Sequence, residues 1–224
     1  MLIASVKQLR MILGKALRET GQAIDRAGSS MTRDVAYMER YSRHRKLMPL
    51  DQLWPSHGKS FIAPNASLIG EVLVGTNCAI MYGAVLRGDI SALRIDDNVI
   101  IGENTIVQTV GLLPDGIPKS VTIASGVLVE PHCSLTSCVV DTGVWICTGS
   151  VVQQGAKLEQ GCILLPGSVV SPGFTVPAFS VFGGSPAKMV RDVSLKDLEA
   201  FQDALKKASE QAQRNDELLT SLGH

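Results

Sequence analysis

Histidine and cysteine are the side chains of this sequence that are best suited to hold a metal ion or activate a substrate. They are His44, His57, His132, His224, Cys78, Cys133, Cys138, Cys147 and Cys162. No two histidines are three to five residues apart and no two cysteines have C-x-x-C spacing, so the sequence contains no local zinc motif. A site built from these residues would have to be assembled by the fold.

A second candidate is the short polar run Leu86-Arg87-Gly88-Asp89, which combines a guanidinium and a carboxylate two residues apart. An arginine–aspartate pair on a solenoid can be ordinary surface charge or part of an interface. An ion pair of this kind on an exposed surface contributes little by itself. Whether this pair has a function depends on the secondary-structure elements in which it lies.

Those elements are defined by an apolar residue that returns at nearly every sixth position between residues 62 and 182. The series is Ile62, Leu68, Val74, Ile80, Leu86, Ile95, Ile101, Val107, Ile123, Val129, Leu135, Val140, Ile146, Val152, Leu158, Leu164, Val170, Val176 and Phe182. A helix has a period of 3.6 residues and an ordinary strand alternates every two. A six-residue repeat with frequent glycine and asparagine predicts a parallel β-helix, expected over residues 61–186.

Three such hexads form one triangular coil, so residues about eighteen apart stack about 4.8 Å above one another. The segment 110–121 interrupts the repeat with glycine, proline and aspartate and is predicted to protrude as a loop. When this loop is left out, Val107 and Leu135 fall on one face, one coil apart. Gln108 and Thr136, which follow them, are therefore predicted to stack as well.

Composition limits the functional classes. The 21 basic and 21 acidic residues give a net charge of zero, which argues against non-specific nucleic-acid binding. The odd number of cysteines favours a reducing compartment over a disulfide framework. Cys78, Cys133 and Cys162 occupy the small inward position of the repeat, which predicts a packing role. No apolar run is long enough to cross a bilayer.

Residues 1–60 are predicted to form an amphipathic helix followed by an irregular arm. Apolar positions between residues 2 and 24 share one helical face, whereas Lys7, Arg10, Lys15 and Arg18 lie off it. Three interpretations stay open: a cleavable mitochondrial targeting segment, a helix at a membrane surface, and a helix packed on the β-helix or on a partner. The basic run 42–46 is either a solvated surface or a contact for an acidic partner.

Residues 187–224 are predicted to contain a helix that packs on the β-helix. Ser194 and Asp197 have the spacing of a capping box. An apolar stripe follows, made of Leu195, Leu198, Phe201, Leu205 and Ala208. Such a helix can cover apolar surface and protect the solenoid.

The hexads, the run Leu86–Asp89, and the closing run Gly183-Gly-Ser-Pro-Ala187 followed by Arg191 resemble the γ-class carbonic anhydrase family. Residues 18–26 and 42–48 resemble, more narrowly, the γ-carbonic anhydrase subunits of plant and algal mitochondrial complex I. The resemblance implies a left-handed β-helix, an exception to the usual right-handed crossover, and a trimer. It also implies that the first helix stays on the mature protein.

In this family, three histidines from two chains hold a zinc ion at each subunit interface. The resemblance places the family's stacked pair at Gln108 and Thr136 and the third ligand at Pro131, and none of these is histidine. Gly102 stands where the family has a glutamine near the metal-bound water. Neutral oxygen ligands and proline are poor substitutes for imidazole on zinc.

His132 is one residue from the third ligand position, and a slip of one residue turns a strand side chain to the other face, so it is only a weak metal candidate. Arg87 and Asp89, which make salt-bridge contacts across the family's subunit interface, are retained. We therefore expect no catalytic residue and no cofactor on this chain. Zinc is expected only at an interface between partner subunits.

These observations predict a catalytically inactive, structural subunit of a γ-carbonic-anhydrase-like trimer. By resemblance, its partners are other γ-carbonic-anhydrase-like chains, membrane-arm subunits of complex I and, through the N-terminal helix, lipid on the matrix side of the mitochondrial inner membrane. One alternative is an active zinc carbonic anhydrase with displaced ligands that include His132. Another is a hexapeptide-repeat acyltransferase, which needs a general-base histidine that is not well placed here.

Overall fold

The computed structural model describes residues 53–111 and 120–222, together with 13–14, 16–17, 20–21, 23–24, 27–28, 31, 47–48 and 50. The chain divides into two compact units, residues 1–44 with 218–224, and residues 45–217. In the first unit, the described residues between 13 and 31 are helical. His44, His224 and the basic run 42–46 lie outside the described residues.

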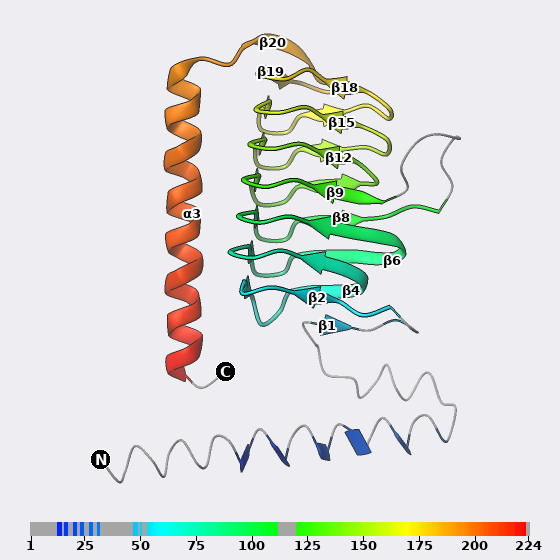
Figure 1. Cartoon of the computed structure of the whole chain (residues 1–224). Coiled ribbons are helices and arrows are strands. Elements are labelled where there is room, and N and C mark those ends of the chain that lie inside the picture. The colour runs from blue at the N-terminus through cyan, green and yellow to red at the C-terminus, as the bar shows by residue number, and fades with distance from the viewer. Residues whose placement is uncertain are drawn as a thin grey trace. The chain divides into compact units, whose positions relative to one another are not determined.

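The second unit is a parallel β-helix with a long C-terminal helix along it (Figure 1). Its strands are β1 (Leu47–Met48), β2 (Ser56–His57), β3 (Phe61–Ile62), β4 (Ser67–Val74), β5 (Ala79–Ile80), β6 (Val85–Ile95), β7 (Ile100–Ile101), β8 (Ile106–Gln108), β9 (Val121–Ile123), β10 (Leu128–Val129), β11 (Ser134–Thr136), β12 (Val139–Val140), β13 (Trp145–Ile146), β14 (Val151–Val152), β15 (Lys157–Leu158), β16 (Ile163–Leu164), β17 (Val169–Val170), β18 (Thr175–Val176), β19 (Ser180–Gly183) and β20 (Lys188–Asp192). The helix α3 is Leu195–Leu222. The predicted left-handed β-helix fold is confirmed.

The coils have three faces, which we name by one strand each. The β8 face stacks the first half of β4, the first half of β6, β8, β11, β14 and β17. The β9 face stacks the second halves of β4 and β6, then β9, β12, β15 and β18. The β10 face stacks β3, β5, β7, β10, β13, β16 and β19. Because β4 and β6 continue around a corner, the first two faces belong to one sheet.

The hexad residues point inward and form the core, as the repeat predicts. On the β8 face, the ladder is Leu68, Leu86, Val107, Leu135, Val152 and Val170, paired in register, and each of these residues is fully buried. Burial of an aliphatic side chain of this size contributes about 1.5–3 kcal/mol. A stack of such ladders on three faces therefore supplies the core that a chain with few aromatic residues needs.

Strand pairing extends the solenoid at both predicted ends. At the N-terminal end, β1 and β2 already pair in parallel with β4, before residue 61. At the C-terminal end, residues 188–192 are not helical but form β20, which pairs antiparallel with β19. The predicted loop 110–121 ends at Ser120, because Val121 opens β9, and residues 112–119 lie outside the described residues.

Helix α3 covers the β10 face. The outward residues of that face are nearly all buried: Phe61, Ala79, Ile100, Leu128, Ile163 and Val181 are each at most 8% exposed. Phe201 packs on Trp145 with ring centroids 5.9 Å apart, and Ala212 is buried further along the helix. Leu195 and Leu198 of the predicted stripe are exposed, so the apolar contact starts at about Phe201 rather than in the first turn.

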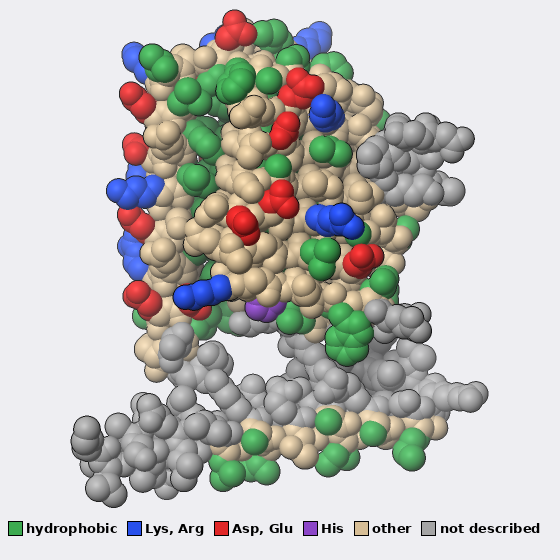
Figure 2. Space-filling model, in the orientation of Figure 1, with side chains coloured by type: hydrophobic (Ala, Val, Ile, Leu, Met, Phe, Trp, Pro, Cys, Tyr) green, Lys and Arg blue, Asp and Glu red, His purple; other side chains and the backbone are tan. Residues whose placement is uncertain are grey.

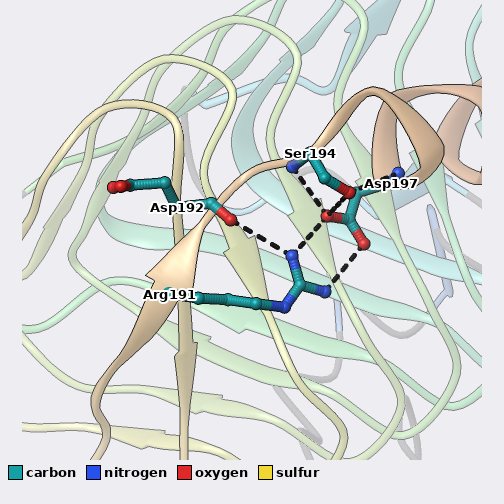
Figure 3. Close-up of polar contacts among 4 residues, drawn as sticks. All are labelled: Arg191, Asp192, Ser194 and Asp197. Carbon is teal, nitrogen blue, oxygen red and sulfur yellow. Dashed lines mark hydrogen bonds and ion pairs between the residues drawn. The ribbon is translucent and has the colours of Figure 1, made fainter.

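The start of α3 is held to β20 by a cluster of hydrogen bonds around Asp197 (Figure 3). The carboxylate of Asp197 accepts from Nη1 and Nη2 of Arg191 at 2.5 and 2.9 Å and from the backbone N and Oγ of Ser194 at 2.8 and 2.6 Å. These donors hold the pKa of Asp197 well below its usual range, with the Arg191 hydrogen bonds as the largest cause. The predicted capping box is confirmed, with an arginine clamp added to it.

Candidate functional site

Gln108 and Thr136 stack on the β8 face as the sequence predicts. Their Cα atoms are partners in the pairing of β8 with β11, and Arg87 of β6 is the partner of Gln108 on the other side. The amide Nε2 of Gln108 donates to Oγ1 of Thr136 at 3.4 Å. Both side chains are half-buried, so the face presents an outward column of polar, uncharged groups next to one guanidinium.

Arg87 and Asp89 form an ion pair within the chain, at the edge of this column. Nη2 of Arg87 lies 2.5 Å from Oδ2 of Asp89, and 46% of the Arg87 side chain is exposed against 16% for Asp89. The second carboxylate oxygen, Oδ1, is buried and has no hydrogen-bond partner among the described residues. In the single chain, therefore, one oxygen of the Asp89 carboxylate is paired and the other is not.

Pro131 lies on a different part of the coil, at the corner between the β10 and β8 faces. It is half-buried and, with Gly102, lines a hollow of about 340 Å³ between the β10 face and α3. A β-carbon on Gly102 would lie 2.5 Å from the backbone N of Pro131 and 2.6 Å from the backbone C of Glu130. The two coils approach too closely here for any side chain larger than that of glycine at position 102.

His132 is exposed at the same corner, with a backbone φ of 61°. This left-handed conformation is uncommon for residues other than glycine, although histidine tolerates it better than most. Its backbone N donates to the carbonyl oxygen of Glu103 at 2.9 Å, and its side chain does not line the hollow beside Pro131. His57 is exposed in β2, at the N-terminal end of the solenoid.

The residues at the three positions where the resemblance places the family's zinc ligands do not fit a zinc ion. Proline has no ligating group, and the side chains of Gln108 and Thr136 offer only neutral oxygen atoms as metal ligands. The hydroxyl oxygen of Thr136 already accepts a hydrogen bond from Nε2 of Gln108. Within the described residues, no group of three or more histidine, cysteine, aspartate or glutamate side chains could hold a metal ion.

The cysteines do not form a thiolate site. All five are buried and free. Burial raises the pKa of Cys133 to about 11 and that of Cys138, Cys147 and Cys162 to about 12. The thiolate is the form that binds metals or attacks substrates, so these thiols are inert near neutral pH.

Comparisons with known proteins agree with this fold and assign the chain to one protein family. Gamma carbonic anhydrase 3, mitochondrial, of Arabidopsis thaliana is 40% identical over 202 residues, which cover 90% of this chain and 78% of that one. Gamma carbonic anhydrase 2, mitochondrial, of the same organism is 31% identical over 195 residues, 87% of this chain and 70% of that one. The chain belongs to the γ-carbonic anhydrase family.

A solved structure supports the fold of this γ-carbonic anhydrase homologue. A hexapeptide transferase family protein from Anaplasma phagocytophilum superposes with a TM-score of 0.69 and 28% identity, covering 76% of this chain and 98% of that one. No family model matches the chain. The family assignment therefore depends on the relatives, and the solved structure adds the hexapeptide-repeat architecture.

Glu130 is a structural residue of this homologue that the sequence analysis did not single out. Its Oε1 accepts from Nε1 of Trp145 at 2.9 Å, and its Oε2 accepts from the backbone N and Oγ1 of Thr148 at 2.9 and 2.7 Å. The carboxylate thus connects the corner beside Pro131 to the next coil and orients the indole of Trp145, which packs on Phe201. Its partners are 15 and 18 residues away, close to the coil repeat, and this spacing was the available signal.

Proposed function

We propose that this chain is a non-catalytic, structural subunit of a γ-carbonic-anhydrase-type trimer. The observation that carries the proposal is the hydrogen bond between Gln108 and Thr136, the two residues that the resemblance places at the family's stacked ligand positions. Pro131 at the third position and Gly102, with no room for a glutamine, add to it. The retained Arg87 and Asp89 favour an assembly role.

The proposal has a consequence for the whole trimer, because each metal site of the family uses residues from two chains. A chain with neither the stacked pair nor the third ligand removes both sites at the interfaces that it shares. A heterotrimer with one such chain then keeps at most one zinc site, between its two partners.

Native mass spectrometry and metal analysis of the trimer, purified with its partners, test this directly. We expect no more than one zinc ion per trimer, and none in a trimer made of this chain alone. More than one zinc ion per heterotrimer would overturn the proposal. A bicarbonate-dehydration assay of the purified chain with added zinc should show no activity above background. Activity there would support the alternative in which His132 serves as a displaced ligand.

We further propose that the trimer sits on the membrane arm of mitochondrial complex I, on the matrix side of the inner membrane. Both Arabidopsis relatives described above are named as mitochondrial, and the N-terminal segment resembles that of complex I subunits. Leu13, Leu17, Ile24 and Met31 of the first helix are each at least 62% exposed, an apolar face suited to a lipid surface. No helical stretch in the described part of the chain has the length and hydropathy needed to cross a bilayer.

Affinity purification from mitochondria solubilised in mild detergent tests this location. We expect respiratory-chain subunits to co-purify with the full-length chain, and to be lost when Leu17 and Ile24 are both replaced by glutamate. A chain that purifies free of every respiratory subunit would contradict the location but leave the catalytic assignment intact.

A further inference from the structure

Helix α3 does not fill all the space over the β10 face. Besides the hollow beside Pro131, a second hollow of about 300 Å³ lies between the helix and the N-terminal strands of this face. Its solenoid side includes the buried side chains of Phe61, Ala79 and Ile100, and Ala212 lines it from α3. Small residues meet here on both elements, and larger ones would close the gap.

The size and the lining of this hollow suit one small organic molecule. Its volume is at the lower end of the range of about 300–1,000 Å³ that is typical of ligand sites. Such sites combine an apolar floor with a few polar groups that fix the orientation of the ligand. A phospholipid with two acyl chains is too large for this space, so we expect a smaller occupant.

Hydrogen bonds between the first coils hold the solenoid side of the rim. Oγ of Ser60 accepts from the backbone N of Cys78 at 3.0 Å, and the backbone N of Asn77 donates to the carbonyl oxygen of Lys59 at 2.9 Å. Nδ2 of Asn77 also donates to Oδ1 of Asn98 at 2.6 Å. The backbone that carries Lys59 is therefore fixed, and a ligand would enter a preformed rim at a smaller cost in ordering.

Two opposite charges lie at this rim, one on each element. Lys59 precedes β3 and Asp216 lies near the end of α3, and both side chains are exposed. Within the described part of the chain, neither forms an ion pair or a side-chain hydrogen bond. Gln213 adds an amide on the helix side. The hollow thus combines an apolar floor with an ammonium group and a carboxylate that lack protein partners.

The outward side of α3 lacks this combination. Figure 2 shows acidic and basic side chains close together along the helix, at the left edge of the view. Charges on this side can pair with each other, as Nη2 of Arg214 and Oε2 of Glu210 do at 3.6 Å. Two unpaired charges beside a buried apolar floor are therefore a property of the hollow rather than of the helix as a whole.

We propose that this hollow binds a small zwitterion with an apolar body, namely a free α-amino acid with an aliphatic or aromatic side chain. The ammonium group of Lys59 pairs with the carboxylate of the ligand, and the carboxylate of Asp216 pairs with its ammonium group. The side chain of the ligand covers Phe61 and Ile100, which removes apolar surface from water. This site does not depend on the proposed trimer.

Isothermal titration of the full-length chain in its natural assembly tests the site, with L-phenylalanine and L-leucine as probes. We expect saturable binding of one amino acid per chain. Phenylpropanoate lacks the ammonium group of phenylalanine, and phenethylamine lacks its carboxylate. Each analogue should bind about fivefold more weakly than L-phenylalanine, near the upper end of what one exposed ion pair contributes.

Substitutions assign each charge of the ligand to its partner. Asp216→Asn and Lys59→Met should each weaken the binding of L-phenylalanine about fivefold. Asp216→Asn should leave the binding of phenylpropanoate unchanged, because that analogue has no ammonium group to lose a partner. Asp203→Asn and Lys206→Met are the matched controls, since both residues are exposed on α3 and neither lines the hollow. All four variants should keep the circular dichroism spectrum of the unmodified chain.

The outcomes separate this site from the proposed function. Absence of saturable binding of both amino acids would overturn the site, whatever the zinc content and the oligomeric state of the assembly. Equal affinities for L-phenylalanine and its two analogues would also overturn it, because the two charges would then play no part. Equal weakening by the control variants would have the same result, since the effect would follow net charge rather than position.

Discussion

At the scale of single residues, Gln108 and Thr136 carry most of the functional argument. Their Cα atoms are register partners one coil apart, and their side chains share a hydrogen bond. The proposal treats these two positions as those of the family's stacked ligand pair, with other residue types in place of histidine. Restoring the residue types therefore tests whether the assigned positions are right.

We expect zinc binding to return only when all three positions are changed. The variant Gln108→His, Thr136→His, Pro131→His supplies three neutral nitrogen ligands per interface in a trimer of this chain, the minimum for a catalytic-type zinc site. The double variant without Pro131→His supplies two and should bind zinc at least tenfold more weakly. Equilibrium dialysis with zinc measures the difference. Equal binding by the double and triple variants would contradict the assignment of Pro131.

At the scale of elements, the junction between β20 and α3 depends on one carboxylate. Asp197 accepts hydrogen bonds from both Arg191 and Ser194, so it caps the helix and fixes the direction in which the helix leaves the solenoid. Helix α3 in turn covers the apolar outward ladder of the β10 face. Damage at this junction should therefore loosen the whole helix rather than its first turn alone.

We predict that Asp197→Asn accelerates hydrogen exchange of the α3 amides and lowers the midpoint of thermal unfolding. Asparagine cannot pair with the guanidinium of Arg191 as an ion, although it keeps the shape of the side chain. Asp203→Asn is the control, because Asp203 lies on the exposed side of the same helix. Exchange rates that rise equally in both variants would show that Asp197 has no special role.

The lowered pKa of Asp197 fixes the pH dependence of this contribution. The folded-state pKa lies below the unfolded value of about 3.9, so the stabilisation is complete above that pH and is lost as the pH falls. Unfolding midpoints between pH 2 and pH 6 should therefore converge for Asp197→Asn and the unmodified chain at the acidic end.

At the scale of the whole molecule, the stacked core protects every thiol. The five cysteines are all buried, although they are spread along the solenoid from residue 78 to residue 162. Because a solenoid core is continuous from coil to coil, one thiol can become accessible only when its neighbours open as well. Thiol reactivity therefore reports on global or multi-coil unfolding.

We predict that a thiol reagent at pH 8 labels no cysteine of the folded chain within minutes and labels all five in denaturant.

The raised pKa values of the buried thiols also imply that the folded chain is less stable in alkali. The neutral thiol of Cys138 contributes its full stabilisation of the fold below the pKa of an unfolded thiol, about 8.5. This contribution is lost as the pH rises towards about 12, the pKa of Cys138 in the folded chain. Rapid labelling of any single cysteine in the native state would contradict the labelling prediction.

Much of the solenoid was readable from the sequence because its repeat is a local property. A six-residue period places each hexad residue inside the coil whatever lies elsewhere in the chain, and it put Gln108 and Thr136 on one face across the loop at 110–121. The capping box at Ser194 and Asp197 was equally local. By contrast, β20 was missed because Lys188–Asp192 carries no repeat and becomes a strand only by pairing with β19.

Tertiary structure alone decided what surrounds the ligand positions. The hydrogen bond between Gln108 and Thr136, the close approach that restricts position 102 to glycine, and the unpaired oxygen of Asp89 all depend on how neighbouring coils stack. The open β8 face likewise emerges only when α3 is seen to cover a different one. The sequence by itself determined the coil and the residue types at its faces, whereas the stacking of the coils and the packing of α3 decided which faces are covered and which stay open.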